Sequence, residues 1–347
     1  MRVTLRDVDP GLRASARIMR FVSRPNRSEA SLRQASWFLA LARRLPGPRG
    51  LRSEERWIPR PDGSRIRIRV YRGADQSAPG PGILWLHGGG YVLGSPEQDR
   101  STYRRIVEAT GGTVVAPAYR LGPEAPYPAA LDDAYTALLG LRDHAPELGV
   151  RNDKLAVAGN SAGGGLAAAV TLLARDRGEV AVAFQMPLYP MIDDRCATES
   201  ARENNAPVWD AVTNRNAWRV YLGGLAGSDD VPEYAAPARA TDVTGLPPTF
   251  TYVGDLEPYR DEVVAYAERL RTAGVEVVFE VYRGCYHGFD VVAPRARVSR
   301  RALAAQAAWL RMAASAYTAP QPEPTPASSP GSKRGTTTWS GHLRPAP

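Results

Sequence analysis

Short apolar segments recur along the middle of the chain and alternate with longer segments of helical periodicity. The apolar segments have the length of β-strands and cover residues 82–86, 113–117, 155–158, 181–187, 249–253 and 276–282. Residues 128–141 and 261–273 lie between strands and have the pattern of helices. Short apolar strands separated by helices are typical of a parallel sheet that is covered on both faces. The pattern therefore predicts an α/β fold with a mainly parallel sheet.

A different pattern precedes this region. Ile66, Ile68 and Val70 alternate with arginines, which is the period of a strand with one exposed face. The turn residues Pro61-Asp62-Gly63 separate this strand from an earlier one at residues 55–59. We expect the row of arginines, at positions 65, 67 and 69, to point into water.

Three further segments do not follow the alternation of strands and helices. Residues 1–50 are rich in arginine and apolar residues at helical spacing, and a helix is expected at 28–45. Residues 194–240 are polar, carry tryptophans and are long for a connection between a strand and a helix. Residues 318–347 are rich in Pro, Ser, Thr and Gly, so we expect a disordered tail.

The stretch Gly159-Asn160-Ser161-Ala162-Gly163 joins the strand at 155–158 to a helical segment. A serine on such a sharp strand-to-helix turn is held in a strained backbone, with its hydroxyl exposed at the end of the sheet. The backbone N–H of Ala162 begins the helix and points to where an oxyanion would form. A flexible loop of small residues would have the same composition, so this motif alone leaves the function open.

A second glycine motif lies upstream. His87-Gly88-Gly89-Gly90 follows the strand at 82–86, and its glycines leave backbone N–H groups free to bind a developing negative charge. By itself, a run of glycines after a strand is more often a flexible hinge than an oxyanion loop. In this order, and about seventy residues apart, the two motifs predict one site for acyl transfer. The N–H groups of Gly88, Gly89 and Ala162 are the candidate oxyanion hole.

Further motifs carry a resemblance to a known family. They are Tyr119-Arg120-Leu121-Gly122-Pro123-Glu124, Glu257-Pro258-Tyr259-Arg260-Asp261-Glu262 and Tyr286-His287-Gly288-Phe289. With them, residues 58–310 resemble the hormone-sensitive-lipase-like family of α/β-hydrolase carboxylesterases. The resemblance implies an α/β-hydrolase domain at 51–317 with a helical cap. The cap would consist of residues 1–50 and an inserted second segment at 194–240.

A serine hydroxyl is a weak nucleophile and needs a base, which in turn needs an orienting acid. In this fold the acid and then the histidine follow the serine along the chain. The four histidines are His87, His144, His287 and His342, and His287 follows the last strand. His287 is therefore the expected base.

The acid has two candidates behind the strand at 249–253. The family pattern places it at Glu257, although most members carry Asp there, and Asp255 is the second choice. Glutamate can hold the imidazole equally well in principle. A second departure is Asn160, where Asp is common in the family. We expect an altered local hydrogen bond at Asn160 and no loss of activity.

The net charge of +8 is concentrated near the N-terminus, where the first 50 residues carry eleven arginines. The sequence has no zinc-ligand spacing, Walker-type phosphate loop, dinucleotide motif or nucleic-acid-binding module. We therefore expect no metal, no cofactor and no nucleic-acid partner. Cys196 and Cys285 are too few for a disulfide framework, and no apolar segment has transmembrane length. We expect a cytoplasmic protein without stable membrane insertion, and a homodimer is left open.

The sequence thus favours a serine carboxylesterase that hydrolyses small to medium acyl esters through an acyl-enzyme on Ser161. Tyr91, Trp209 and Trp218 are the expected substrate-binding residues. Three alternatives stay open: a small-ligand receptor on the same fold, an amidase or deacetylase with the same triad, and a lipase at a membrane interface. The basic N-terminal helix suggests the last of these.

Overall fold

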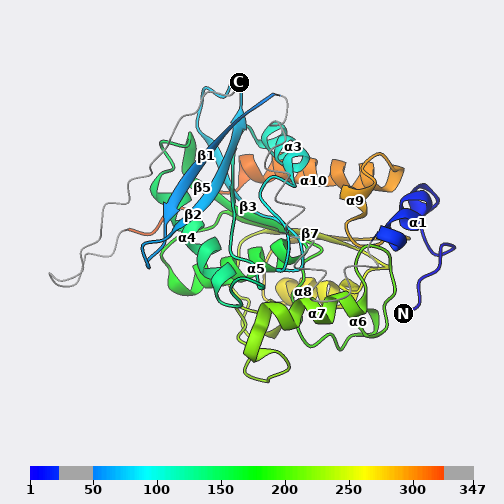
Figure 1. Cartoon of the computed structure of the whole chain (residues 1–347). Coiled ribbons are helices and arrows are strands. Elements are labelled where there is room, and N and C mark those ends of the chain that lie inside the picture. Colours follow the sequence, from blue (N-terminus) through cyan, green and yellow to red (C-terminus); the bar gives the residue numbers. More distant parts are fainter. Residues whose placement is uncertain (23–49, 324–347) are drawn as a thin grey trace.

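The computed structural model describes residues 1–22 and 50–323. In this part of the chain, eight strands form one sheet in the order β1-β2-β4-β3-β5-β6-β7-β8 (Figure 1). The strands are β1 Leu51–Pro59, β2 Arg65–Gly73, β3 Gly80–Leu86, β4 Thr113–Pro117, β5 Val150–Asn160, β6 Phe184–Leu188, β7 Thr249–Gly254 and β8 Val277–Tyr282. β2 pairs antiparallel with β1 and β4, and the other pairs are parallel. The predicted α/β fold with a mainly parallel sheet is confirmed.

Helices cover both faces of the sheet. In Figure 1, α3 and α10 lie on one side of it, and α4, α5 and α8 lie on the other. The described helices are η1 Pro10–Leu12, α1 Arg13–Val22, α3 Arg100–Thr110, α4 Ala129–Asp143, α5 Ala162–Arg177, α6 Glu199–Arg202, α7 Ala211–Leu222, η4 Gly223–Leu225, η5 Pro237–Arg239, α8 Arg260–Thr272, α9 Phe289–Val292 and α10 Arg297–Ala316. The helices predicted at 128–141 and 261–273 correspond to α4 and α8.

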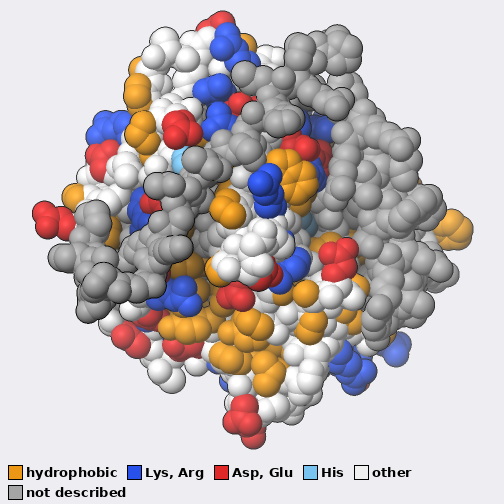
Figure 2. All heavy atoms as spheres, turned by 60° about the vertical axis from the view of Figure 1, so that its left-hand side comes forward, with side chains coloured by type: hydrophobic (Ala, Val, Ile, Leu, Met, Phe, Trp, Pro, Cys, Tyr) orange, Lys and Arg blue, Asp and Glu red, His pale blue; other side chains and the backbone are white. Residues whose placement is uncertain are grey.

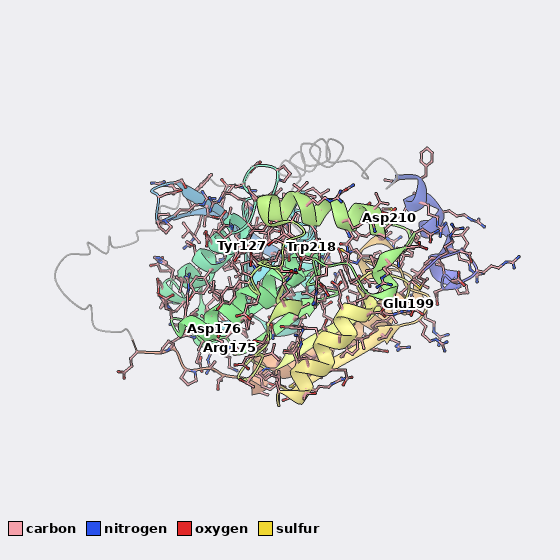
Figure 3. All side chains as sticks on the ribbon, turned by 90° about the horizontal axis from the view of Figure 1, so that it is seen from below. Tyr127, Arg175, Asp176, Glu199, Asp210 and Trp218 are labelled. Atoms are coloured by element: carbon pink, nitrogen blue, oxygen red, sulfur yellow. The ribbon has the colours of Figure 1, made fainter. Side chains whose placement is uncertain are left out.

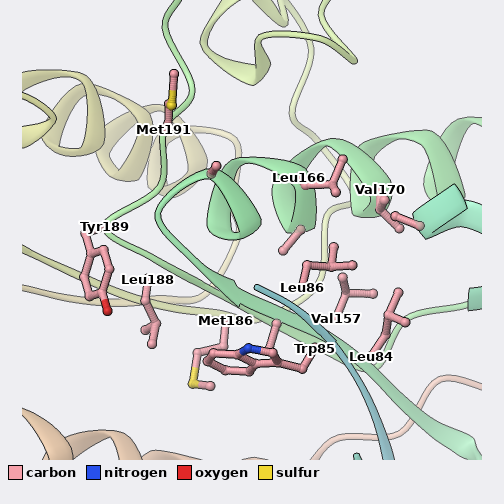
Figure 4. Close-up of a cluster of buried hydrophobic side chains, with 14 of the residues drawn as sticks. Leu84, Trp85, Leu86, Val157, Leu166, Val170, Met186, Leu188, Tyr189 and Met191 are labelled. Atoms are coloured by element: carbon pink, nitrogen blue, oxygen red, sulfur yellow. The ribbon is translucent and has the colours of Figure 1, made fainter. Parts of the chain in front are cut away.

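The core is built around α5, which is buried on all sides from Ala162 to Ala174. A helix that is apolar all round belongs in the centre of a protein. Its side chains pack on the central strands, as Figure 4 shows for Leu166 and Val170. The strand residues of this cluster are Leu84, Trp85, Leu86, Val157, Met186 and Leu188. The central sheet and α5 therefore form one rigid unit behind the site.

The expectation of a solvated arginine row is wrong for Arg67, which is 8% exposed. Its guanidinium makes two bonds to the Glu97 carboxylate, of 2.5 Å and 3.1 Å. Glu97 lies in the loop after β3, and this loop covers the β2 face that the alternating pattern leaves to solvent. A buried arginine of this kind requires a paired carboxylate.

The N-terminal residues contact two distant segments. The Asp9 N–H donates to the Gly284 carbonyl at 2.9 Å, and Ser15 on α1 accepts from the Tyr286 hydroxyl at 2.7 Å. The Val3 N–H donates to the side chain of Asn205 in the inserted segment at 2.6 Å. These contacts favour the assignment of both segments to a cap, which stays a prediction. The helix expected at 28–45 lies outside the described residues.

The sequence predicts a disordered tail from residue 318, but residues 318–323 make hydrogen bonds to the rest of the protein. The Ala319 N–H donates to the Asp153 carbonyl at 2.8 Å, and the Gln321 side chain donates to the Ala181 carbonyl at 2.9 Å. Residues 318–323 therefore run beside the first half of β5 and the segment before β6. Residues 324–347 lie outside the described part. None of the described helices combines the length and hydropathy needed to cross a membrane. Cys196 and Cys285 are both free and buried.

The Arg67–Glu97 pair leads to a prediction about stability. Glu97→Gln leaves a buried guanidinium without its main counter-charge, so we expect the free energy of unfolding to fall by about 3 kcal/mol. Urea denaturation measures this loss. As a control, Arg104→Met breaks a solvent-exposed pair with Glu108 and is expected to cost less than about 1 kcal/mol. Equal losses in the two variants would contradict the importance of the buried pair.

Candidate active site

Ser161 lies on the sharp turn between β5 and α5 that its motif predicts. Its backbone has φ 57° and ψ −123°, a strained conformation for a residue with a side chain. Two backbone bonds hold this turn: the Ser161 N–H donates to Leu188 at 2.9 Å, and its carbonyl accepts from Met191 at 3.0 Å. The last residue of β6 and the loop after it therefore hold the backbone of Ser161 in place.

Side chains from three separate loops form a chain of hydrogen bonds. His287, after β8, has its Nε2 at 2.8 Å from the Ser161 Oγ. Its Nδ1 lies 2.5 Å from the Oε2 of Glu257, which follows β7. All three residues are buried, with His287 5% exposed and Glu257 fully covered. The order serine, imidazole, carboxylate is the arrangement that activates a serine nucleophile.

The structure places Glu257, and not Asp255, against the imidazole. The second oxygen of Glu257 accepts from the Gly254 N–H at 2.6 Å, which fixes the carboxylate. Burial raises the pKa of Glu257, and the bonds to His287 and Gly254 oppose that shift. Asp255 instead accepts from the Cys285 N–H at 3.2 Å and so ties together the loops after β7 and β8. The two acids therefore have different roles, one facing the base and one joining the loops.

The backbone around Gly88 and Gly89 is oriented by bonds to its carbonyls. The His87 carbonyl accepts from the Tyr119 hydroxyl at 2.6 Å, and the Gly88 carbonyl accepts from the Gln98 side chain at 3.1 Å. In a trans peptide the N–H points opposite to the carbonyl, so the Gly88 and Gly89 N–H groups face away from these partners. Among the described residues, neither N–H donates to a protein acceptor.

Ser161 lies next to Gly88 of the oxyanion loop. A Cβ added at Gly88 would lie 3.3 Å from the Cβ of Ser161. The N–H of Ala162, in the first turn of α5, has no acceptor within its own helix. His87 supports this loop as a neutral ring, since burial lowers its pKa to about 4 and its ring stacks on Tyr119 at 4.3 Å. The supporting roles of Tyr119 and Gln98 were not predicted from the sequence.

The three expected substrate-binding residues occupy different environments. Tyr91 is buried, donates to the Met191 carbonyl at 3.1 Å and stacks on Tyr221 at 3.9 Å. Trp218 points from α7 into the interior, as Figure 3 shows, and packs on Tyr91 at 5.7 Å. Both residues are packed among buried aromatic rings, and their role in substrate binding stays a prediction. Trp209 is different, because its ring centroid lies 6.3 Å from that of His287.

The hydrogen bond expected for Asn160 stays a prediction, because its side-chain oxygen is buried without a hydrogen-bond partner among the described residues. Asn160 lies near the buried carboxyl of Asp99 and opposes the rise in its pKa, and this carboxyl accepts from the Trp85 indole N–H at 2.8 Å. Burial raises the pKa of Asp99 to about 6. An aspartate at position 160 would place a second carboxylate beside this one, and the two would repel each other when ionised. The asparagine avoids that repulsion.

No group of three or more His, Cys, Asp and Glu side chains in residues 1–22 and 50–323 is arranged to hold a metal ion.

Comparison with known proteins places this site in a family. A family model described as the alpha/beta hydrolase fold matches residues 83–291, which include both glycine motifs and His287. The chain belongs to the α/β-hydrolase family, in its hormone-sensitive-lipase-like branch of carboxylesterases. This assignment agrees with the order of strands in the sheet. It also agrees with the position of Ser161, Glu257 and His287 after the carboxyl ends of β5, β7 and β8.

Relatives in this family cover most of the chain. Carboxylesterase NlhH of Mycobacterium tuberculosis is 37% identical over 264 residues, which are 74% of this chain and 82% of that protein. An ethyl acetate hydrolase of Pseudomonas putida is 32% identical over 232 residues, which are 66% of this chain and 72% of that protein. The solved structure of a bacterial heroin esterase is similar with a TM-score of 0.81 at 37% identity, covering 90% of this chain and 99% of that one.

The separate environments of the two acids lead to a prediction about catalysis. Glu257→Gln keeps the shape of the side chain but no longer stabilises the imidazolium, so kcat for ester hydrolysis should fall by about 10⁴-fold. Asp255→Asn should leave kcat within about tenfold, because Asp255 does not contact His287. Steady-state kinetics on a p-nitrophenyl ester measure both. The reverse ranking would move the acid to Asp255.

Asp99 leads to a prediction about pH. Because its pKa is raised to about 6, the folded protein holds a proton there between pH 4 and 6 that the unfolded chain releases. The contribution of Asp99 to stability therefore falls as pH rises through this window, by up to about 3 kcal/mol.

Asp99→Asn removes this dependence. We therefore expect the free energy of unfolding of the variant, minus that of the native chain, to increase between pH 4 and pH 7, so that the variant becomes relatively more stable. Urea titrations at the two pH values give that difference. A difference that stays constant with pH would show that Asp99 titrates normally.

Proposed function

We propose that this protein is a serine carboxylesterase that hydrolyses small to medium acyl esters through an acyl-enzyme on Ser161. The observation that carries the proposal is the imidazole of His287, which bridges the Ser161 hydroxyl at 2.8 Å and the Glu257 carboxylate at 2.5 Å. The family supports the same reaction, since its relatives include proteins named carboxylesterase and ethyl acetate hydrolase.

The geometry supports a two-step mechanism. Ser161 Oγ attacks the ester carbonyl while His287 Nε2 takes its proton, and Glu257 stabilises the imidazolium. The negative charge on the carbonyl oxygen is bound by the N–H groups of Gly88, Gly89 and Ala162. His287 then gives its proton to the departing alcohol. Water repeats the sequence on the acyl-enzyme and releases the acid.

The alternatives differ in what they require of the site. A receptor without catalytic activity has no need of a serine, an imidazole and a carboxylate in hydrogen-bonding order, so this arrangement favours an enzyme. An amidase or deacetylase would use the same groups, and hydrolysis of p-nitroanilides would identify it. A lipase at a membrane interface would prefer emulsified long-chain esters over dissolved short ones.

The expected partners also stay predictions. On the coloured part of the face in Figure 2, Lys and Arg side chains are interspersed with Asp and Glu, which favours a small-molecule substrate over nucleic acid. The cytoplasmic location would be tested by cell fractionation, and a homodimer by sedimentation.

The substrate class is tested with p-nitrophenyl esters of increasing acyl length. We expect the highest kcat/KM among the short and medium chains, because the serine and histidine lie in a buried site. Ser161→Ala removes the nucleophile and should lower kcat by about 10⁶-fold. Activity that survives in Ser161→Ala would overturn catalysis through Ser161. A clear preference for emulsified long-chain esters would overturn the proposed substrate class.

A further inference from the structure

A buried amide on α7 accepts hydrogen bonds from two aromatic side chains that surround the catalytic imidazole. The Oδ1 of Asn214 accepts from the Trp209 indole N–H at 3.2 Å and from the Tyr259 hydroxyl at 3.1 Å. Its Nδ2 donates to the sulfur of Cys196 at 3.3 Å. An indole nitrogen can only donate, so the amide oxygen must face it and the orientation of the amide is fixed. Asn214 has no exposed surface, so these partners replace water completely.

Both aromatic donors lie beside His287. The Tyr259 ring meets the imidazole edge-on, with centroids 5.0 Å apart. The Trp209 centroid lies 6.3 Å from it. The six-membered ring of Trp209 also lies against the oxyanion loop, since a Cβ added at Gly90 would fall 2.3 Å from its Cη2 atom. The indole therefore extends from the oxyanion loop to the base.

The backbone that presents Trp209 is strained. Val208 has φ 74°, which is an outlier for a β-branched residue. The Trp209 N–H donates to the Pro207 carbonyl at 2.9 Å, which closes a tight turn. Asp210 follows as the N-cap of α7, where Figure 3 shows it at the start of the helix. A conformation of this kind persists only when its surroundings hold it. The bond from the indole to Asn214 is one such restraint.

We propose that Asn214 is a positioning residue that holds Trp209 as a wall between the oxyanion loop and His287, and thereby limits the size of the ester that reaches Ser161. This inference rests on the proposed esterase function. Asn214 does not touch the reacting atoms. It acts through Trp209, whose indole occupies space that a bulkier ester would need.

Removing the amide oxygen should change selectivity more than basal activity. Without its acceptor, the indole N–H is left unpaired in a buried position, which favours a different rotamer of Trp209. The strained turn at Val208 then relaxes, and the Trp209 indole moves away from its position beside His287. Short esters need little of the space that Trp209 occupies, so we expect their turnover to change less than that of larger esters. Longer or wider esters gain room.

The experiment compares three forms of the full chain: native, Asn214→Leu and Asn214→Asp. Leucine has a similar volume and no acceptor, whereas aspartate retains an oxygen acceptor. The readout is the ratio of kcat/KM for a bulky ester to that for a small one. Two pairs are used, p-nitrophenyl octanoate against the acetate, and benzyl acetate against ethyl acetate. This ratio does not depend on the fraction of active enzyme, so a poorly folding variant cannot imitate the effect.

We expect the ratio to rise about tenfold in Asn214→Leu for at least one pair, which is the usual value of added space in an apolar pocket. In Asn214→Asp it should stay within about threefold of the native ratio. Arg219→Leu, at an exposed position of the same helix, is the control and should leave the ratio unchanged.

A double-mutant cycle tests the route through Trp209. Trp209→Phe keeps an aromatic ring but has no N–H, so adding Asn214→Leu to it should change the ratio by no more than about twofold. An unchanged ratio in Asn214→Leu, or the same large rise in Asn214→Asp, would overturn the inference. A native chain that hydrolyses none of the four esters would overturn the esterase proposal instead.

Discussion

The close packing of α5 against the end of β3 is the constraint on which the site depends. A Cβ at Gly163 would lie 2.0 Å from the Leu86 carbonyl oxygen and 2.4 Å from that of His87. A Cβ at Gly159 would lie 2.3 Å from the carbonyl oxygen of Gly163. Only glycine fits at these two positions. Because α5 begins at the nucleophile and β3 leads into the oxyanion loop, this contact sets the distance between the serine and the loop donors.

Buried polar groups then fix the loops that the sheet leaves free. Glu262 on α8 accepts from the Ile192 and Asp193 N–H groups, at 3.0 Å and 3.4 Å, and so ties down the loop behind Ser161. Burial raises its pKa well above the usual value. Asp255 and Asn214 join other pairs of segments in the same way. Buried polar groups lower stability unless they are hydrogen-bonded. When they are hydrogen-bonded, each holds the loop that it contacts in one conformation.

Much of the site could be predicted because its motifs are local. The glycines, Ser161 and His287 stand beside strands whose apolar pattern is clear, and β4 coincides with its predicted bounds. Choosing Glu257 over Asp255 needed the family pattern, since both acids follow the same strand. What could not be predicted depends on partners distant in the chain. Arg67 pairs with a carboxylate thirty residues later, and Asn214 bonds a tyrosine forty-five residues later.

The substrate-binding candidates show the same limit. Tyr91 follows the first glycine motif, whereas Trp209 and Trp218 lie in the inserted segment, and nothing in their spacing shows which of them would contact an ester. Tyr91 is placed in the core by its bond to Met191, one hundred residues away in sequence. Helix α10 was likewise not predicted, although its Trp309 packs under β6 and β7 through Phe184 and Phe250.

The strained turn presents an activated hydroxyl at Ser161, and this hydroxyl can be tested directly. A fluorophosphonate probe reacts with such hydroxyls, and peptide mass spectrometry locates the adduct. We expect a single adduct on Ser161 in folded protein and none after denaturation. Folded protein that is unlabelled at Ser161, or labelled at another residue, would contradict it.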